Sequence, residues 1–183
     1  MIIGITGTLG SGKGTIVAFL KKKGFVHYSS SDVLIRILND RDLPVDREHL
    51  SSLANELMQE YEGGVLHFSH KYAVEANDQN YILEALHRVS EAEYIKKIGG
   101  TVIGVDADTE VRYKRIAKRK DGEKDKVTFE QFVADCNREE EGKIPGGPNI
   151  RAVMRMSDHI IKNSKSLLDL KKEIDNFLNK NHD

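Results

Sequence analysis

Three glycines, a lysine and a threonine near the start of the chain have the spacing of a phosphate-binding loop. Gly7, Gly10 and Gly12 allow backbone N–H groups to turn towards an anion, because glycine adopts backbone angles that other residues avoid. Lys13 supplies a cation for the β- and γ-phosphates of a nucleotide, and Thr15 supplies a hydroxyl near the accompanying Mg²⁺. This short stretch therefore predicts binding of a nucleoside triphosphate.

The sequence around this loop has the order strand, loop, helix that such a site requires. A buried strand is predicted over residues 2–6 and a helix over residues 14–24, so the positive end of a helix faces the anion. The general pattern places a hydroxyl residue directly after the lysine, whereas here Gly14 takes that position and Thr15 carries the hydroxyl. We expect the whole loop, Ser11 and Gly14 included, to bind the phosphates of ATP.

The spelling G-x-x-G-x-G-K-G-T, from Gly7 to Thr15, narrows the class of protein. It resembles the loop of adenylate kinase and related nucleoside monophosphate kinases, in which Gly-Thr follows the lysine. The resemblance implies a P-loop NTPase fold, ATP and Mg²⁺ as cofactors, and transfer of a phosphoryl group to a small nucleotide acceptor.

The elements that must position this loop alternate between strands and helices along the whole chain. Strands are predicted over residues 2–6, 25–29, 81–86, 101–107 and 158–163. Helices are predicted over residues 14–24, 31–39, 46–64, 65–77, 90–100, 108–120, 128–142 and 166–180. This order predicts one α/β domain over residues 1–183, a three-layer fold with a five-stranded parallel sheet flanked by helices. A helical acceptor-binding insertion is expected at about residues 31–77 and a short lid at about residues 120–141.

Helix-start signals support several of these segments. Asp46 is a predicted N-cap. Ser90 with Glu93, and Thr128 with Gln131, have the spacing of a capping box.

Composition excludes several other classes of protein. The 183 residues are 31% charged with a formal net charge of −1, which predicts neither a nucleic-acid partner nor a membrane surface. A single cysteine, Cys136, excludes an internal disulfide, and its charged surroundings predict no catalytic role. No apolar run approaches the roughly 20 residues of a membrane span, and the N-terminus has no signal-peptide pattern, so we expect a cytoplasmic protein.

In an open α/β sheet, ligands bind beyond the carboxyl ends of the strands, so the residues there are the next candidates. The segment HYSSSDVLIR after the second strand resembles the HISTGDMLR stretch that contacts the acceptor in adenylate kinases. The resemblance implies substrate-binding roles for Ser30, Ser31, Asp32 and Arg36. The alternative is that Ser30, Ser31 and Asp32 only cap the helix that follows.

The segment YILEALHRV after the third strand resembles the Asp-Gly-Phe-Pro-Arg motif of the same family, with Ala85 and His87 departing from it. Glu84 stands at the position of the aspartate and can hold a water on Mg²⁺. Arg88 stands at the position of the arginine and can bind an acceptor phosphate with two hydrogen bonds. The alternative for Arg88 is a surface residue at the start of a helix.

The helix after the fourth strand is strongly basic. Arg112, Arg115 and Arg119 share one face, and Arg115 with Arg119 resembles the R-x-x-x-R pair that begins the lid in nucleoside monophosphate kinases. That resemblance implies that they neutralise the transferring phosphoryl group. The alternative is a solvated basic helix. Asp106, at the end of the strand, is a further Mg²⁺ candidate.

The predicted lid has no pair of Cys or His residues with zinc spacing, so a metal-bound lid is not expected. Arg138 lies on its helix and could reach the phosphates when the lid closes.

The last part of the chain points to a second branch of the same superfamily. MSDHIIKNSKSLLDLKKEID resembles the end of dephospho-coenzyme A kinases, with Asn163 at the end of the fifth strand. The resemblance implies that amide groups there frame the adenine of ATP.

The two resemblances require different acceptor chemistry. A nucleoside monophosphate needs arginines, for which Arg88 and Arg36 are available, whereas a hydroxyl acceptor needs a base such as Asp32. The arginines favour a nucleoside or deoxynucleoside monophosphate, with dephospho-coenzyme A kinase-like transfer to a hydroxyl as the alternative. A P-loop ATPase or switch that acts on a macromolecular partner would leave Arg88, Arg115 and Arg119 without a role. The sequence predicts no oligomeric state.

Overall fold

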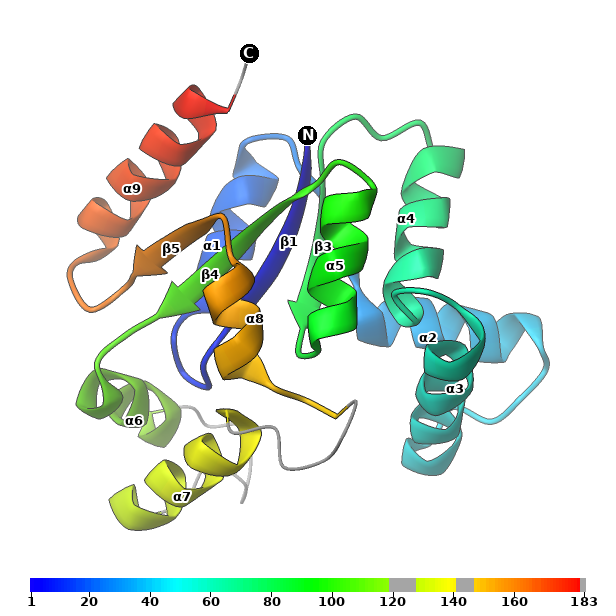
Figure 1. Ribbon diagram of the computed structural model, residues 1–183, viewed down its shortest axis with the longest axis horizontal. Helices are drawn as coiled ribbons and strands as arrows, with labels where there is room; N and C mark the ends of the chain where they lie inside the picture. Colours follow the sequence, from blue (N-terminus) through cyan, green and yellow to red (C-terminus); the bar gives the residue numbers. More distant parts are fainter. Residues whose placement is uncertain (119–127, 141–146, 182–183) are drawn as a thin grey trace.

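The computed structural model describes residues 1–118, 128–140 and 147–181, and within them a parallel sheet has the strand order β2-β3-β1-β4-β5 (Figure 1). The strands are β1 (Ile2–Gly7), β2 (Val26–Ser29), β3 (Tyr81–Leu86), β4 (Thr101–Asp106) and β5 (His159–Lys162). The five predicted strands and their parallel arrangement are confirmed. Because all strands run in the same direction, the segments that follow them meet at one edge of the sheet.

Helices cover both faces of this sheet, as a three-layer α/β fold requires. They are α1 (Lys13–Lys22), α2 (Ser30–Asp40), α3 (Arg47–Glu60), α4 (Val65–Glu75), α5 (Val89–Lys97), α6 (Thr109–Ala117), α7 (Phe129–Glu140), α8 (Ile150–Met156) and α9 (Leu167–Lys180). In Figure 1, α5 and α8 lie in front of the sheet and α1 lies behind it. Among the described helices, none combines the length and the apolar character needed to cross a membrane.

The buried strand residues divide between two cores, one on each face. Ile3 and Ile5 of β1 pack with apolar residues of α1 and α9. On the other face, α4, α5 and α8 pack on alternate residues of β3 and β4, such as Leu83 and Val102. A Cβ atom at Gly4 would lie 2.9 Å from Cγ1 of Ile95, so α5 rests directly on the backbone of β1.

The segment between β2 and β3 forms a small lobe with its own apolar centre. Residues of α2 and α3, including Leu38 and Leu57, are buried against one another and against α4. Figure 1 shows this lobe on the β3 side of the sheet, away from β5. It lies within the region expected to form an acceptor-binding insertion, residues 31–77, and its role in acceptor binding stays a prediction.

The described part of the expected lid packs against the phosphate loop rather than standing apart from it. Phe132 and Cys136 of α7 are buried with Ile116 of α6, and Leu9 of the loop packs against them. The rest of the expected lid, residues 120–127 and 141, lies outside the described residues.

The predicted helix starts have mixed outcomes. The Asp46 side chain accepts a hydrogen bond from the backbone N–H of His49, which confirms its N-cap role. Thr128 likewise accepts from the backbone N–H of Gln131, but the Gln131 side chain donates to Asp135 instead of completing a capping box.

Two features differ from the sequence-based expectations. The predicted box of Ser90 and Glu93 is wrong, because the N-cap of α5 is Arg88, two residues before Ser90. The short helix α8 was not predicted, and its first turn is capped by Asn149, whose side chain accepts from the N–H of Ala152.

Candidate functional site

The phosphate loop connects β1 to α1, and backbone angles and close contacts require glycine at three of its positions. Gly7, Gly10 and Gly12 have φ values of 151°, 77° and 100°. A Cβ atom would lie 2.3 Å from the Val105 carbonyl oxygen at Gly7, and 2.3 Å from Nδ2 of Asn163 at Gly12. The loop can therefore take this shape only with glycine at these positions. A Cβ atom at Gly14, by contrast, would meet no described atom within 4 Å.

Lys13 lies over the loop that precedes it. Its Nζ donates to the carbonyl oxygens of Gly7 at 2.7 Å and Thr8 at 3.2 Å. The ammonium group is thus held at the mouth of the loop, at the N-terminus of α1, where a bound phosphate would meet both the charge and the helix dipole.

Two side chains from distant elements hold the middle of the loop. Asn163, after β5, donates from Nδ2 to the Ser11 carbonyl oxygen at 2.8 Å. Arg115 of α6 donates from Nη1 to the same oxygen at 3.2 Å and from Nη2 to the Asn163 carbonyl oxygen at 2.8 Å. Arg115 therefore lies at the phosphate loop, as the lid resemblance implies. Asn163 lies there too, but its side-chain amide N–H is committed to the loop; sequence reasoning missed this positioning contact.

Ser11 has a second unusual feature. Its side chain is fully buried in the loop, and its Oγ has no hydrogen-bond partner in the described structure. Buried polar atoms in native proteins are nearly always paired, so an unpaired hydroxyl inside this loop fits a site that receives a polar ligand.

The three Mg²⁺ candidates lie on α1 and on the two strands that flank β1. Thr15 is exposed on the first turn of α1. Glu84 and Asp106 lie on the strands on either side of β1, and Asp106 Oδ1 accepts from Thr8 Oγ1 at 3.0 Å. Among the described residues no cluster of three His, Cys, Asp or Glu side chains could hold a metal alone. A few oxygen donors fit Mg²⁺, which keeps water and phosphate oxygens among its ligands.

A cavity of 390 Å³ lies between the lobe and the carboxyl end of β3. It is lined by Ser29, Ser30, Ser31, Leu34, Ala54, Val65, Glu84, His87, Arg88 and Glu91. Ser30 Oγ donates to the Glu84 carbonyl oxygen at 2.7 Å, which joins the start of α2 to β3. The Glu84 carboxylate contacts the His27 ring, with 2.8 Å between Oε2 and Nε2. Because β3 is next to β1, the cavity is a neighbour of the phosphate loop.

Arg88 reaches this cavity from the N-terminus of α5, but it has a partner there. Its Nη1 lies 3.4 Å from Oε1 of Glu91, a residue that is only 8% exposed. The other oxygen of Glu91 accepts from the backbone N–H groups of His87 at 2.7 Å and Arg88 at 3.0 Å. Sequence reasoning missed Glu91, although a glutamate three residues after an N-cap is itself a capping signal.

The other predicted acceptor residues have different surroundings. Asp32 is exposed in the first turn of α2, where its backbone N–H donates to Ser29 Oγ, and the cavity lining does not include it. Arg36 is exposed as well and stacks on the Tyr72 ring, with 3.8 Å from Cζ to the ring centroid. Of the predicted acceptor residues on α2, the structure thus brings Ser30 and Ser31 to the cavity.

The predicted lid arginines have different surroundings from one another. Arg112 is buried and donates to the carbonyl oxygen of Ala107 at 3.0 Å, that of Leu9 at 3.5 Å, and to Cys136 Sγ at 3.4 Å. It joins α6, α7 and the loop, which gives Cys136 a packing role.

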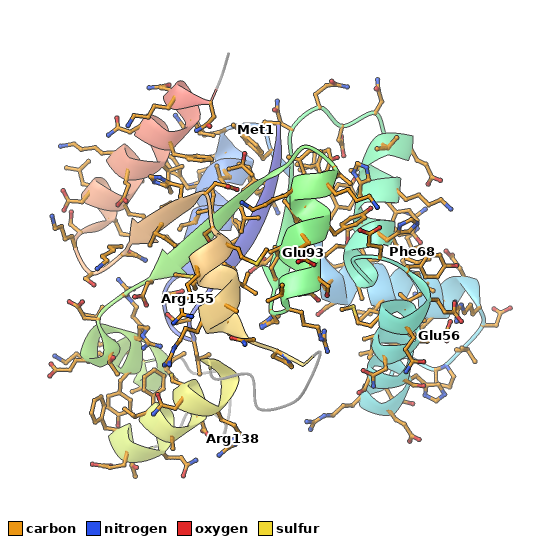
Figure 2. All side chains as sticks on the ribbon, viewed as in Figure 1. Met1, Glu56, Phe68, Glu93, Arg138 and Arg155 are labelled. Atoms are coloured by element: carbon orange, nitrogen blue, oxygen red, sulfur yellow. The ribbon has the colours of Figure 1, made fainter. Side chains whose placement is uncertain are left out.

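The other two predicted lid arginines are Arg119 and Arg138. Arg119 is outside the described residues. Arg138 is exposed on α7, 3.3 Å from Asp135, and Figure 2 shows it at the lower edge of the view, on a different part of the molecule from Glu56 of the lobe.

Comparison with known proteins agrees with this arrangement. A family model described as an AAA domain, AAA_18, matches residues 3–143, so the chain belongs to this family. UPF0200 protein MJ1399 of Methanocaldococcus jannaschii is 27% identical over 182 residues, which are 97% of this chain and 89% of the relative.

Two solved structures show the same fold. TT1252 from Thermus thermophilus superposes with a TM-score of 0.61 and 20% identity, over 98% of this chain and 97% of the other. Dephospho-CoA kinase from Campylobacter jejuni superposes with a TM-score of 0.58 and 18% identity, over 98% and 96% of the two chains. These likenesses show the fold, which this chain shares with a protein named dephospho-CoA kinase.

Proposed function

We propose that this member of the AAA domain family is a phosphotransferase that moves the γ-phosphoryl group of ATP to a small molecule held in the cavity beside Arg88. The observation that carries the proposal is the pairing of two sites at one edge of the sheet. The glycine loop with Lys13 over it can bind the phosphate donor, and a separate cavity at the end of β3 can hold an acceptor. An ATPase that lacks an acceptor would not need the second site.

On the donor side, the loop would bind the phosphates of ATP through its backbone N–H groups. Lys13 would exchange its contacts with Gly7 and Thr8 for the β- and γ-phosphates. Thr15, with Glu84 or Asp106 through water, would hold Mg²⁺, which neutralises charge on the phosphates. Arg115, already at Ser11, would face the phosphoryl group whose charge spreads during transfer.

On the acceptor side, the sequence favours a nucleoside monophosphate through Arg88 and Arg36. Since Arg36 stacks on Tyr72, that preference depends on Arg88 alone among the described residues. The alternative of a hydroxyl acceptor is supported by the structural likeness to a protein named dephospho-CoA kinase. The role of Asp32 as its base is not supported by the cavity lining, whose acidic residues are Glu84 and Glu91.

The experiment that tests the proposal follows the products of ATP. The protein is incubated with ATP, Mg²⁺ and a panel of nucleosides, nucleoside monophosphates and dephospho-coenzyme A, and both ADP and phosphorylated acceptor are quantified. A phosphotransferase should produce ADP and phosphorylated acceptor in equal amounts. Release of ADP and inorganic phosphate that no acceptor changes would instead favour an ATPase or switch.

A further inference from the structure

A groove of 230 Å³ lies between α1 and α9, the two helices that pack on the face of the sheet opposite to α5 and α8. It is lined by Thr15, Ala18, Phe19, Lys22, Leu167, Leu170, Lys171 and Ile174. On both helices the lining residues recur at i, i+3, i+4 and i+7, so each helix presents one stripe of its surface to the groove. The groove follows α1 for about 10 Å, or two helical turns. Its end at Thr15 borders the proposed donor site, and the inference concerns the rest.

The lining of this groove is mostly apolar. Leu170 and Ile174 are buried in the core beneath it, and Phe19 packs against that core while remaining partly exposed. Leu167, at the start of α9, is 65% exposed. Single exposed leucines are common on protein surfaces, but a leucine and an aromatic ring that share one concave lining are typical of a binding surface.

The charged residues of the lining all have the same sign. They are Lys22 and Lys171, and the lining includes no acidic residue. Neither lysine has an ion-pair partner among the described residues. The Lys171 Nζ lies 6.0 Å from the centroid of the Phe19 ring, so its charge is beside the apolar wall. Lys23 also lies near this ring, at 5.4 Å, but its charge is paired with Asp175 at 2.7 Å.

From this groove we infer a docking site for an acidic amphipathic helix of another protein. The apolar side chains of that helix pack against Phe19 and Leu167, and its carboxylates lie beside Lys22 and Lys171. A groove between two helices accepts the ridge of a third, and the uncompensated lysines select an acidic partner. A second copy of this chain that placed the same groove against itself would bring lysines against lysines, which is unfavourable.

The test uses a synthetic, fluorescently labelled peptide of about 18 residues, long enough to form a helix, with leucines along one face and glutamates on the other. Fluorescence anisotropy measures its binding to the full chain. Two pairs of variants locate the site: Leu167→Glu with Leu168→Glu, and Lys171→Glu with Lys172→Glu. The members of each pair are exposed neighbours on α9 that undergo the same change, but only the first of each pair lines the groove.

We expect saturable binding of the acidic peptide to the wild type. Leu167→Glu and Lys171→Glu should each weaken it at least about tenfold, because they place a carboxylate against those of the peptide. Leu168→Glu and Lys172→Glu should change it less than about threefold, because water and salt screen a charge outside the groove. Circular dichroism should show the same helix content in all the variants, since every substituted residue is exposed.

Several results would overturn the inference. One is the absence of saturable binding at about 1 mM acidic peptide. Another is an equal loss of binding in both members of either pair, because the contact would then not be confined to the groove. A control peptide that carries lysines in place of the glutamates should not bind, and equal binding of the two peptides would show that charge does not select the partner.

Two other occupants are distinguished in the same assay. Because the groove ends at Thr15, the acidic peptide is also titrated in the presence of saturating Mg²⁺·ADP. Displacement of the peptide by ADP would show that the groove is part of the donor site, and the inference would fail. A labelled single-stranded oligonucleotide that binds with the same dependence on Leu167 and Lys171 would also overturn it. Peptide binding does not require phosphoryl transfer, so this inference and the proposed function stand or fail separately.

Discussion

The ammonium of Lys13 lies over the carbonyl oxygens of Gly7 and Thr8, at the point where the loop and the N-terminus of α1 converge. A cation placed before the substrate arrives stabilises developing charge without having to reorganise during the reaction. Lys13 was predictable from the sequence because the glycines and the lysine of such a loop are only a few residues apart.

Replacement of Lys13 by alanine should lower kcat by about 10²–10³-fold, the usual effect of losing one preorganised charge in an active site. The fold should persist, since the Lys13 side chain is at the mouth of the loop and contributes to none of the described apolar cores. Steady-state kinetics with circular dichroism of the same variant check both statements. Wild-type turnover in Lys13→Ala would show that catalysis occurs elsewhere.

Arg88 and Arg36 form a matched pair for the acceptor side, because the structure places only the first in the cavity. Arg88→Ala should lower kcat/KM for the acceptor by about ten- to hundredfold, because it removes a side chain that lines the cavity and leaves the buried Glu91 without its counter-charge, and it should leave ATP affinity unchanged. Arg36→Ala, which removes a stacked exposed side chain, should leave acceptor kinetics close to wild type. Equal losses in the two variants, or a loss of ATP affinity in Arg88→Ala, would contradict the assignment of Arg88 to the acceptor cavity.

At the scale of elements, the loop depends on partners that come from β5 and α6. Asn163 and Arg115 both contact the Ser11 carbonyl oxygen, so the conformation of the loop depends on the packing of two distant segments. Glycine at position 12 lets Asn163 approach the loop closely, so this glycine is needed for packing as well as for its backbone angles.

Alanine variants of two glycines with positive φ can distinguish the effect of backbone strain from that of steric crowding. Gly12 has φ 100° and Gly24 has φ 92°, but a Cβ atom would contact Asn163 only at Gly12, since no described atom lies within 4 Å of the corresponding position at Gly24. Each alanine variant should lose about 1–2 kcal/mol of unfolding free energy through backbone strain. Gly12→Ala should in addition weaken ADP binding by about 10²-fold, because the loop must shift. ADP titrations and urea denaturation measure the two effects; equal ADP affinity in the two variants would exclude the crowding at Asn163.

Some helices and strands could be predicted from the sequence, and others could not. The strands β1, β3 and β4 were predictable because each is a short, mostly apolar run, and the loop because its signal is local. The helix α8 has only seven residues and is held by tertiary contacts, among them the fully buried Val153, so its own sequence gives a weak signal.

Residue contacts across long sequence separations were out of reach for the same reason. Arg36 was interpreted as an acceptor ligand because the sequence does not reveal its contact with Tyr72, which lies on another helix. The pairing of Arg88 with Glu91 was obscured by the competing spacing of Ser90 and Glu93, and only the position of α5 on the sheet decides between them.

At the scale of the whole molecule, the two sites share one edge of the sheet, and α6 and α7 pack against the loop through Leu9 and Arg112. Nucleotide binding should therefore stabilise the domain as a unit. A hundredfold excess of Mg²⁺·ADP over its Kd should add about 2.7 kcal/mol to the free energy of unfolding. Calorimetry should show this as a rise in Tm that Lys13→Ala largely loses. An unchanged Tm in the wild type at saturating ADP would contradict nucleotide binding to the native state.

The proposal on which the other predictions depend is that this chain transfers a phosphoryl group to an acceptor rather than to water. It is tested most directly by the stoichiometry of ADP and phosphorylated acceptor in a reaction with ATP, Mg²⁺ and a panel of small hydroxyl compounds and nucleoside monophosphates. We expect one phosphorylated acceptor for each ADP, with little ADP when the acceptor is omitted. ADP formed at the same rate with and without acceptors, and matched by inorganic phosphate, would contradict phosphoryl transfer to an acceptor.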